Sequence, residues 1–264
     1  MYTAEQIIAI AQNAGDKILE IYQRDFSIDT KDDQSPLTEA DLAAHNCIVQ
    51  GLKQITPDIP VLSEESSETD LIGRQQWQTY WLIDPLDGTK EFIKRNGEFT
   101  VNIALIENGL PTFGVVYAPV PDVFYVGGAE GAYKLERGTR SDISVAKAPA
   151  INDQWRIVGS RSHQSDEFKS FITKFVNTDV ISMGSSLKIC LVAEGAADLY
   201  PRLGLTSEWD TAAAHAVVNA AGGKVLEYPG LKPLIYNSRP DTLLNPFFIV
   251  CSDVDETWAD QKQS

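Results

Sequence analysis

The sequence predicts a fold of mixed helix and strand, with an α+β first part and an α/β second part. Helical patterns open the chain, short strands with hairpin turns fill its middle, and strand and helix patterns alternate after about residue 150. The 264 residues are 43% hydrophobic and 22% charged, which suits one large domain or two closely packed lobes. This composition excludes disordered and fibrous proteins.

The chain opens with two helix patterns. A capping box at residues 3–6 is followed by apolar residues at helical spacing as far as Tyr22. Residues 29–36 are polar and rich in turn formers, and the run Thr38-Glu39-Ala40-Asp41 then starts a second helix with apolar positions up to Leu52. We expect these two helices to pack against each other.

Short strands follow the helices. The apolar runs Ile59–Leu62 and Tyr80–Ile83 each lead directly into acidic residues. Beyond them, two β-rich runs between residues 100 and 117 flank Asn108-Gly109, the dipeptide that most favours a type I′ hairpin. Further strands are expected at Val123–Val126 and Ala132–Leu135. The middle of the chain therefore predicts an antiparallel meander.

Strand and helix patterns alternate in the second half of the chain. After a polar stretch around residues 137–153, the sequence predicts strands Arg156–Gly159, Val180–Ser182 and Asp198–Tyr200, and helices Asp166–Phe175 and Ser186–Ala193. An alanine-rich helix, Asp210–Ala221, ends at two glycines, and Phe247–Cys251 supplies a closing strand. This half is typical of an α/β protein.

Charge and sequence patterns exclude several classes of protein. Asp and Glu total 37 against 22 Lys and Arg, and the net charge of −15 argues against a protein that coats nucleic acid. No stretch approaches the roughly 20 apolar residues of a membrane span, and the first residues lack the pattern of a secretory signal. Cys47, Cys190 and Cys251 are far apart and are expected to be buried free thiols. A cytoplasmic protein is the default expectation.

The segment Asp84-Pro85-Leu86-Asp87-Gly88-Thr89 carries the most chemical information. Two carboxylates three residues apart surround a proline that fixes the turn, and the Leu86 carbonyl between them is a third hard oxygen ligand. Gly88 and Thr89 can open a helix whose N–H groups face an anion. These features favour a cation and phosphate site, although an Asp-rich turn that only caps a strand fits the spacing as well.

This segment resembles the signature of the inositol monophosphatase superfamily, whose members are Mg²⁺-dependent, lithium-sensitive phosphatases. Four further segments match in order, so that the likeness covers nearly the whole chain: residues 38–41, 63–65, 184–188 and 209–213. The runs Lys90-Glu91-Phe92, Ser160–His163 and Tyr200–Arg202 are similar to the 3′(2′),5′-bisphosphate nucleotidases of the bacterial CysQ type. Inositol phosphatases usually carry a Thr-Asn-Phe-like run at the first of these points.

The resemblance implies an α+β / α/β layered sandwich, the sugar-phosphatase fold of inositol monophosphatase, in which helix and sheet layers alternate. An N-terminal α+β lobe, residues 1–150, would carry most of the metal ligands. A C-terminal α/β lobe, residues 151–264, would carry Asp210 and the substrate-binding residues. The two lobes would meet at a metal-binding cleft.

The resemblance also implies metal ligands and catalytic residues. Two or three Mg²⁺ ions would be held by hard oxygens, which suit that cation: Glu64, Asp84, the Leu86 carbonyl, Asp87 and Asp210. Asp41 and Thr89 resemble the pair that activates the attacking water, with Glu64 as a third catalytic residue.

Each of these assignments has a plainer alternative. Thr38-x-x-Asp41 and Ser207-x-x-Asp210 both fit helix capping boxes, in which the acid only satisfies backbone donors. Glu65 would serve chemically as well as Glu64, and only the register of the motif selects the first.

A substrate with two phosphate groups needs two anion sites. The phosphate that is cleaved would be bound by the metal site and the start of the next helix: Glu64, Leu86, Asp87, Gly88, Thr89 and Asp210. The 5′-phosphate contacts and the adenine contact resemble a second group: Ser185, Lys188, Tyr200 and Arg202 for the phosphate and His163 for the base. Ordinary surface charge is the alternative explanation for Lys188 and Arg202.

The implied reaction is hydrolysis of the 3′-phosphate of adenosine 3′,5′-bisphosphate to AMP and phosphate, in sulfur assimilation or nucleotide recycling. A second implied substrate is 3′-phosphoadenylyl sulfate. One alternative is an inositol or sugar-phosphate monophosphatase on the same scaffold, which Lys90, Lys188 and Arg202 disfavour. The other is a non-catalytic Mg²⁺- or nucleotide-binding protein, which is disfavoured because every residue of the implied metal and catalytic set is present. We expect a monomer or homodimer in the cytoplasm, or one peripheral on the cytoplasmic face of the inner membrane.

Overall fold

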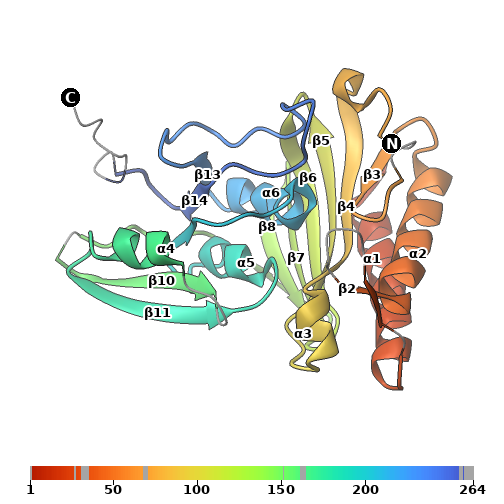
Figure 1. Cartoon of the computed structure of the whole chain (residues 1–264), viewed down its shortest axis with the longest axis horizontal. Coiled ribbons are helices and arrows are strands. Elements are labelled where there is room, and N and C mark those ends of the chain that lie inside the picture. Colours follow the sequence, from red (N-terminus) through yellow and green to blue (C-terminus); the bar gives the residue numbers. More distant parts are fainter. Residues whose placement is uncertain are drawn as a thin grey trace.

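A computed structural model describes residues 2–26, 28–30, 36–67, 71–150, 152–160, 165–255 and 258. Its main elements stack in five layers (Figure 1). In order, these are helices α1 (Ala4–Tyr22) and α2 (Glu39–Ile55), a seven-stranded sheet, helices α5 (Leu187–Ala193) and α6 (Ala212–Ala220), a five-stranded sheet, and helix α4 (Asp166–Ile172). The predicted sandwich of alternating helix and sheet layers is confirmed.

Helices α1 and α2 begin at the two predicted capping boxes. Thr3 accepts a hydrogen bond from the Gln6 backbone, and Gln6 accepts one from the Thr3 backbone. Thr38 and Asp41 have the same arrangement at the start of α2. Both helices bury their apolar faces against each other and against the seven-stranded sheet, which positions the first turn of α2 beside the end of a central strand.

The seven-stranded sheet is the predicted meander, with strands in the order β3 to β9 and a parallel β3–β4 pair at one edge. Asn108 (φ 51°) and Gly109 (φ 79°) both lie in the left-handed region, as a type I′ turn requires. The strands are β3 (Val61–Ser63), β4 (Thr79–Asp87), β5 (Thr100–Glu107), β6 (Leu110–Ala118), β7 (Val123–Gly128), β8 (Gly131–Glu136) and β9 (Thr139–Asp142).

The five-stranded sheet has the order β11-β10-β12-β14-β13, in which β10 pairs in parallel with both neighbours and β14 is antiparallel to both of its own. Helix α5 follows β11, and a short 3-10 turn, η2 (Glu208–Asp210), precedes α6. The strands are β10 (Gln154–Ser160), β11 (Asn177–Met183), β12 (Leu199–Arg202), β13 (Lys224–Glu227) and β14 (Phe248–Cys251).

Alternate residues of β4 face two different cores. Trp81 and Ile83 pack with α1 and α2, whereas Tyr80 and Leu82 pack with α5 and α6. A third core covers the far face of the five-stranded sheet, with Phe168 of α4. Because β4 is buried on both faces, the acidic segment at its end lies inside the molecule, between the two sheets and α2.

Several expectations need correction. Four strands were not predicted, namely β1 (Ile28–Thr30), β2 (Pro36–Thr38), β9 and β13. The last helix does not begin at Asp210, because residues 208–210 form a 3-10 turn that the Asp210 carboxylate closes on Ser207.

Cys47 is half-buried, whereas Cys190 and Cys251 are buried as expected, and all three are free. None of the described helices is long and apolar enough to cross a membrane.

Candidate active site

The site begins where β4 breaks its regular pairing. The register with β5 shifts between Asp84 and Asp87, because Pro85 has no N–H to donate to the neighbouring strand. The Leu86 N–H donates to Asp84 Oδ1 at 3.1 Å and closes the turn. Asp84 is only 1% exposed, so this turn brings a carboxylate into the interior.

A glycine then turns the chain into helix α3 (Thr89–Ile93). Gly88 caps the helix at φ 94°, and a Cβ at this position would lie 3.1 Å from the Glu98 carbonyl oxygen. A side chain is therefore disfavoured here both by backbone conformation and by space. The Thr89 hydroxyl at the start of α3 donates to Asp41 Oδ1 at 3.3 Å, and lies 3.4 Å from the Leu86 carbonyl.

Asp41 divides its two oxygens between two tasks. Oδ2 accepts from the Thr38 backbone N–H at 2.7 Å and from the Thr38 hydroxyl at 2.6 Å, which is the capping box. Oδ1 accepts from Thr89. Asp41 is 1% exposed, so the first turn of α2 holds a buried carboxylate in a fixed orientation toward the start of α3.

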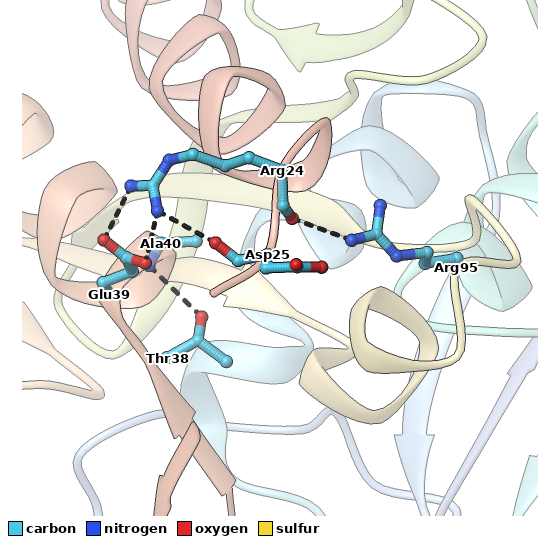
Figure 2. Close-up of polar contacts among 6 residues, drawn as sticks. All are labelled: Arg24, Asp25, Thr38, Glu39, Ala40 and Arg95. Atoms are coloured by element: carbon cyan, nitrogen blue, oxygen red, sulfur yellow. Dashed lines mark hydrogen bonds and ion pairs between the residues drawn. The ribbon is translucent and has the colours of Figure 1, made fainter. Parts of the chain in front are cut away.

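Arginine contacts join the three helices at the edge of this site (Figure 2). Arg24, after α1, forms two hydrogen bonds with Glu39 in the first turn of α2, at 2.7 and 2.8 Å. Arg95, after α3, donates to the Arg24 carbonyl at 2.8 Å. The Ala40 N–H donates to the Thr38 hydroxyl at 3.2 Å. These contacts fix the start of α2, and therefore Asp41, relative to α3.

Ser186 connects the end of β4 to the second half of the chain. Its hydroxyl lies 2.7 Å from Asp87 Oδ2 and 2.6 Å from the Asp210 carbonyl oxygen, and accepts from Asn102 Nδ2 at 2.8 Å. Its backbone N–H also donates to Asp87 Oδ2, at 2.5 Å. Asp210 Oδ2 accepts from the Ser207 N–H at 2.9 Å. Asp87, at the end of β4, and Asp210, at the end of η2, thus face one space although they lie in different halves of the chain.

Two adjoining cavities result. An acidic cavity of about 290 Å³ is lined by Glu64, Asp84, Leu86, Asp87, Gly88, Thr89, Lys90, Glu91 and Asp210. A basic pocket of about 240 Å³ beside it has further lining residues that include Lys94, Ser185, Ser186, Lys188, Tyr200 and Arg202. Five residues line both spaces: Asp87, Gly88, Lys90, Glu91 and Asp210.

Burial and like charges shift the pKa values in the acidic cavity. The pKa of Asp84 lies well above its ordinary value, first because of burial and then because of Glu64, Asp87 and Asp210. Burial, followed by the charge of Asp87, raises the pKa of Asp210 to about 8. In the basic pocket, burial lowers the pKa of Lys188, and nearby Asp87 opposes this shift. Uncompensated negative charge is therefore concentrated in the acidic cavity.

The chemistry of these donors fits a hard divalent cation. Carboxylate and carbonyl oxygens are the preferred ligands of Mg²⁺, and bound cations would offset the repulsion that raises the pKa values of Asp84 and Asp210. Among the described residues, no three His, Cys, Asp or Glu side chains already converge on one point.

The structure brings together most of the residues named from the sequence. Glu64, Asp84, Leu86, Asp87, Thr89 and Asp210 line the acidic cavity, with Asp41 behind Thr89. Lys188 and Arg202 line the basic pocket, and the Arg202 Nε is buried with no hydrogen-bond partner among the described residues. His163 lies outside the described residues. Sequence reasoning missed Ser186, whose only signal was its place in the Gly184–Lys188 run.

Comparisons with known proteins agree with this geometry. The model of the inositol monophosphatase family matches residues 2–260. The 3′(2′),5′-bisphosphate nucleotidase CysQ of Salmonella typhimurium is 53% identical over 249 residues, which are 93% of this chain and 98% of that protein. The corresponding protein of Escherichia coli K12 is 52% identical over the same shares.

Solved structures give the same relationship. The crystal structure of CysQ from Bacteroides thetaiotaomicron is 45% identical, with a TM-score of 0.82, and the match covers 96% of this chain and 97% of that one. An inositol monophosphatase from Anabaena is 26% identical, with a TM-score of 0.74 over 96% and 92% of the two chains. From the matching family model, the identity with CysQ and the shared fold, it follows that the chain belongs to the inositol monophosphatase family, a family of metal-dependent enzymes, and to its CysQ-type members.

Proposed function

We propose that this chain is a 3′(2′),5′-bisphosphate nucleotidase. It hydrolyses the 3′-phosphate of adenosine 3′,5′-bisphosphate to give AMP and phosphate, and it also acts on 3′-phosphoadenylyl sulfate. One observation carries the assignment: an acidic cavity and a basic pocket share a wall of five residues. One space suits cation-assisted cleavage of a phosphate, and the adjoining space suits a second phosphate on the same nucleotide. The identity of 52–53% with CysQ proteins supports the same substrate.

Mg²⁺ is the cation that we propose for the acidic cavity. Two or three ions would be held by Glu64, Asp84, the Leu86 carbonyl, Asp87 and Asp210, which all line it. When bound, the ions supply positive charge to the phosphate oxygens and lower the pKa of the attacking water.

The residues around the cavity have distinct roles in the proposed reaction. Because Thr89 donates its hydroxyl proton to Asp41, its oxygen keeps lone pairs to accept a hydrogen bond from water. The water is thereby oriented for in-line attack on the phosphorus. The N–H groups of Gly88 and Thr89, at the start of α3, hold the phosphate oxygens.

Lys188 and Arg202 would bind the 5′-phosphate. The guanidinium of Arg202 is anchored through a hydrogen bond from one terminal nitrogen to the Leu205 carbonyl, at 2.7 Å, while its buried Nε has no partner among the described residues. A buried, unpaired cationic donor is costly, and a phosphate oxygen would satisfy it. A phosphate dianion would also offset the desolvation that lowers the pKa of Lys188.

The test is phosphate release with Mg²⁺ from adenosine 3′,5′-bisphosphate and from inositol 1-phosphate, measured in parallel. We expect a strong preference for the bisphosphate. Lys188→Ala should raise the KM for the bisphosphate by about tenfold or more, because a charged hydrogen bond is lost. Exposed Lys169 forms an ion pair with Asp166 alone among the described residues, so Lys169→Ala is the matched control that removes a lysine elsewhere.

Three outcomes are informative. Equal loss with both substrates for Lys188→Ala would contradict its role in binding the second phosphate. A preference for inositol 1-phosphate would keep the metal chemistry but overturn the substrate. No turnover of either substrate would favour the non-catalytic binding protein.

We also propose a lobe boundary near residue 150 and a location in the cytoplasm. All strands of the seven-stranded sheet precede residue 150 and all strands of the five-stranded sheet follow it, which supports the boundary. Free thiols at Cys47, Cys190 and Cys251 are usual in a reducing compartment. Separate expression of residues 1–150 and 151–264 tests the boundary. Cell fractionation tests the location and any peripheral association with the inner membrane, and sedimentation separates monomer from homodimer.

A further inference from the structure

Asp210 stands at the end of a short turn whose backbone hydrogen bonds are few and long. The 3-10 turn η2 contributes two backbone hydrogen bonds around it, from the Asp210 N–H to the Ser207 carbonyl at 3.2 Å and from the Thr211 N–H to the Glu208 carbonyl at 3.3 Å. Both are long, and 3-10 hydrogen bonds have poorer geometry than those of an α-helix. Within the turn, the Asp210 carboxylate is held by the Ser207 N–H at 2.9 Å, so its orientation also depends on how Ser207 and the rest of the turn are held from outside.

Asn245 provides such contacts on both sides of Asp210. Its side-chain Nδ2 lies 2.7 Å from the Ser207 carbonyl oxygen, 3.1 Å from the Thr211 hydroxyl and 3.3 Å from the Thr206 hydroxyl. Its backbone N–H donates to the Thr206 carbonyl at 2.8 Å. One side chain, 5% exposed, thus spans the turn from residue 206 to residue 211.

The segment that carries Asn245 is itself firmly held. The Glu208 N–H donates to the Leu243 carbonyl at 2.8 Å. Arg74, 6% exposed, donates to the Arg239 carbonyl at 2.9 Å and to the Pro240 carbonyl at 2.8 Å. Because Arg74, Glu208 and Asn245 are buried, water cannot easily replace a hydrogen bond that one of them loses.

We propose that Asn245 is a positioning residue, which holds the turn 206–211 so that the Asp210 carboxylate faces the acidic cavity. The inference rests on the proposed role of Asp210 as a metal ligand. Asn245 is 35 residues away in sequence and does not line either cavity, so it acts only through the turn. Residues that hydrogen-bond to a metal ligand typically change metal affinity by about 10–100-fold, and Asn245, which acts through Ser207, should lie at the lower end of this range.

The test compares Asn245→Ala with Thr56→Ala. Thr56 is also a buried hydrogen-bonding residue, accepting from Trp81 Nε1 at 2.9 Å, but it lies at the opposite end of α2 from Asp41. Mg²⁺ binding is measured by titration calorimetry and by the rise in Tm on adding Mg²⁺, and kcat and KM are measured as a function of Mg²⁺ concentration. We expect Asn245→Ala to weaken Mg²⁺ binding by about tenfold and to reduce the Mg²⁺-dependent rise in Tm. Thr56→Ala should lower Tm with and without Mg²⁺ by the same amount.

A further variant separates the two hypotheses. Asp210→Asn should abolish most of the Mg²⁺-dependent rise in Tm, and if it does not, the proposed metal site fails. If Asp210→Asn has this effect but Asn245→Ala binds Mg²⁺ like Thr56→Ala, the proposed role of Asn245 is overturned. If Asn245→Ala does not fold, Asn245→Ser, which keeps a shorter donor, should retain part of the Mg²⁺ affinity. If folded Asn245→Ser binds Mg²⁺ with the affinity of the native chain, the proposal is also overturned.

Discussion

Removing the hydroxyl of Ser186 should weaken both the fold and the active site. Ser186 is only 3% exposed. Its hydroxyl connects three groups by hydrogen bonds: the Asn102 amide, the Asp87 carboxylate and the Asp210 carbonyl. In Ser186→Ala, the Asp210 carbonyl loses this partner, and Asn102 Nδ2 keeps only a contact of 3.5 Å to Asp87. Two under-satisfied buried groups, each costing about 1–3 kcal/mol, predict a loss of about 3 kcal/mol in the free energy of unfolding. Asp87 keeps the backbone N–H of residue 186, which limits the effect.

The neighbouring serine supplies a matched control. Ser185 is also buried and lines the basic pocket, but within the described part of the chain its hydroxyl makes a single contact, 3.4 Å from the Leu187 N–H. Ser185→Ala should cost less than about 1 kcal/mol and act mainly on the KM for the bisphosphate. Urea denaturation gives the stability, and phosphate release against Mg²⁺ concentration gives the activity. If the free energy of unfolding of Ser186→Ala lies within about 0.5 kcal/mol of that of the native chain, this hydroxyl does not stabilise the fold as predicted.

Three further predictions concern other parts of the molecule. Thr89→Val removes the hydroxyl that donates to Asp41 and should lower kcat by about 10²–10⁴-fold with little change in KM. Steady-state kinetics measures both constants, and a change confined to KM would contradict the role of the hydroxyl. In EDTA, Tm should fall as the pH rises from 5 to 8. The pKa values of Asp84 and Asp210 are raised in the folded chain, so protonation stabilises the fold at low pH and this stabilisation is lost as the pH rises. Asp84→Asn should flatten the dependence of Tm on pH, and an unchanged slope in this variant would contradict the prediction. Asp198→Ala breaks three hydrogen bonds to Arg156 and should cost about 3 kcal/mol in urea denaturation, while kcat below the melting range stays unchanged.

The parts of the fold that the sequence predicts are those in which burial leaves a pattern. The central strands and α1 have regular apolar spacing because a neighbouring layer covers them. Strand β9, Thr139–Asp142, is exposed at all four residues, so that no side-chain period distinguishes it from a loop. Strand β13 is equally short and lies at a sheet edge. Pairing of this kind cannot be found by periodicity.

The site was predictable to the extent that its residues are adjacent in the chain. The spacing of Asp84 and Asp87 fitted a cation site and a strand-capping turn equally well. A resemblance to a known family was needed to choose between them and to add Glu64 and Asp210. Ser186 and Asn245 left no such signal. Ser186 forms hydrogen bonds to groups that are 24 to 99 residues away, and Asn245 to groups that are 34 to 39 residues away, which only the tertiary fold brings together.

The two capping boxes show why local reasoning left the roles of Asp41 and Asp210 undecided. Capping and function compete only if a carboxylate has a single oxygen to offer. Oδ2 of Asp41 accepts from Thr38 and Oδ2 of Asp210 accepts from Ser207, while Asp41 Oδ1 accepts from Thr89. The cap therefore fixes the side chain from one oxygen and leaves the other for chemistry. Because a cap also anchors the acid to backbone of known geometry, the same four-residue pattern serves stability and orientation at once, and a proline at residue 38 or 207, which removes the backbone N–H that donates to the acid, should impair catalysis as well as the fold.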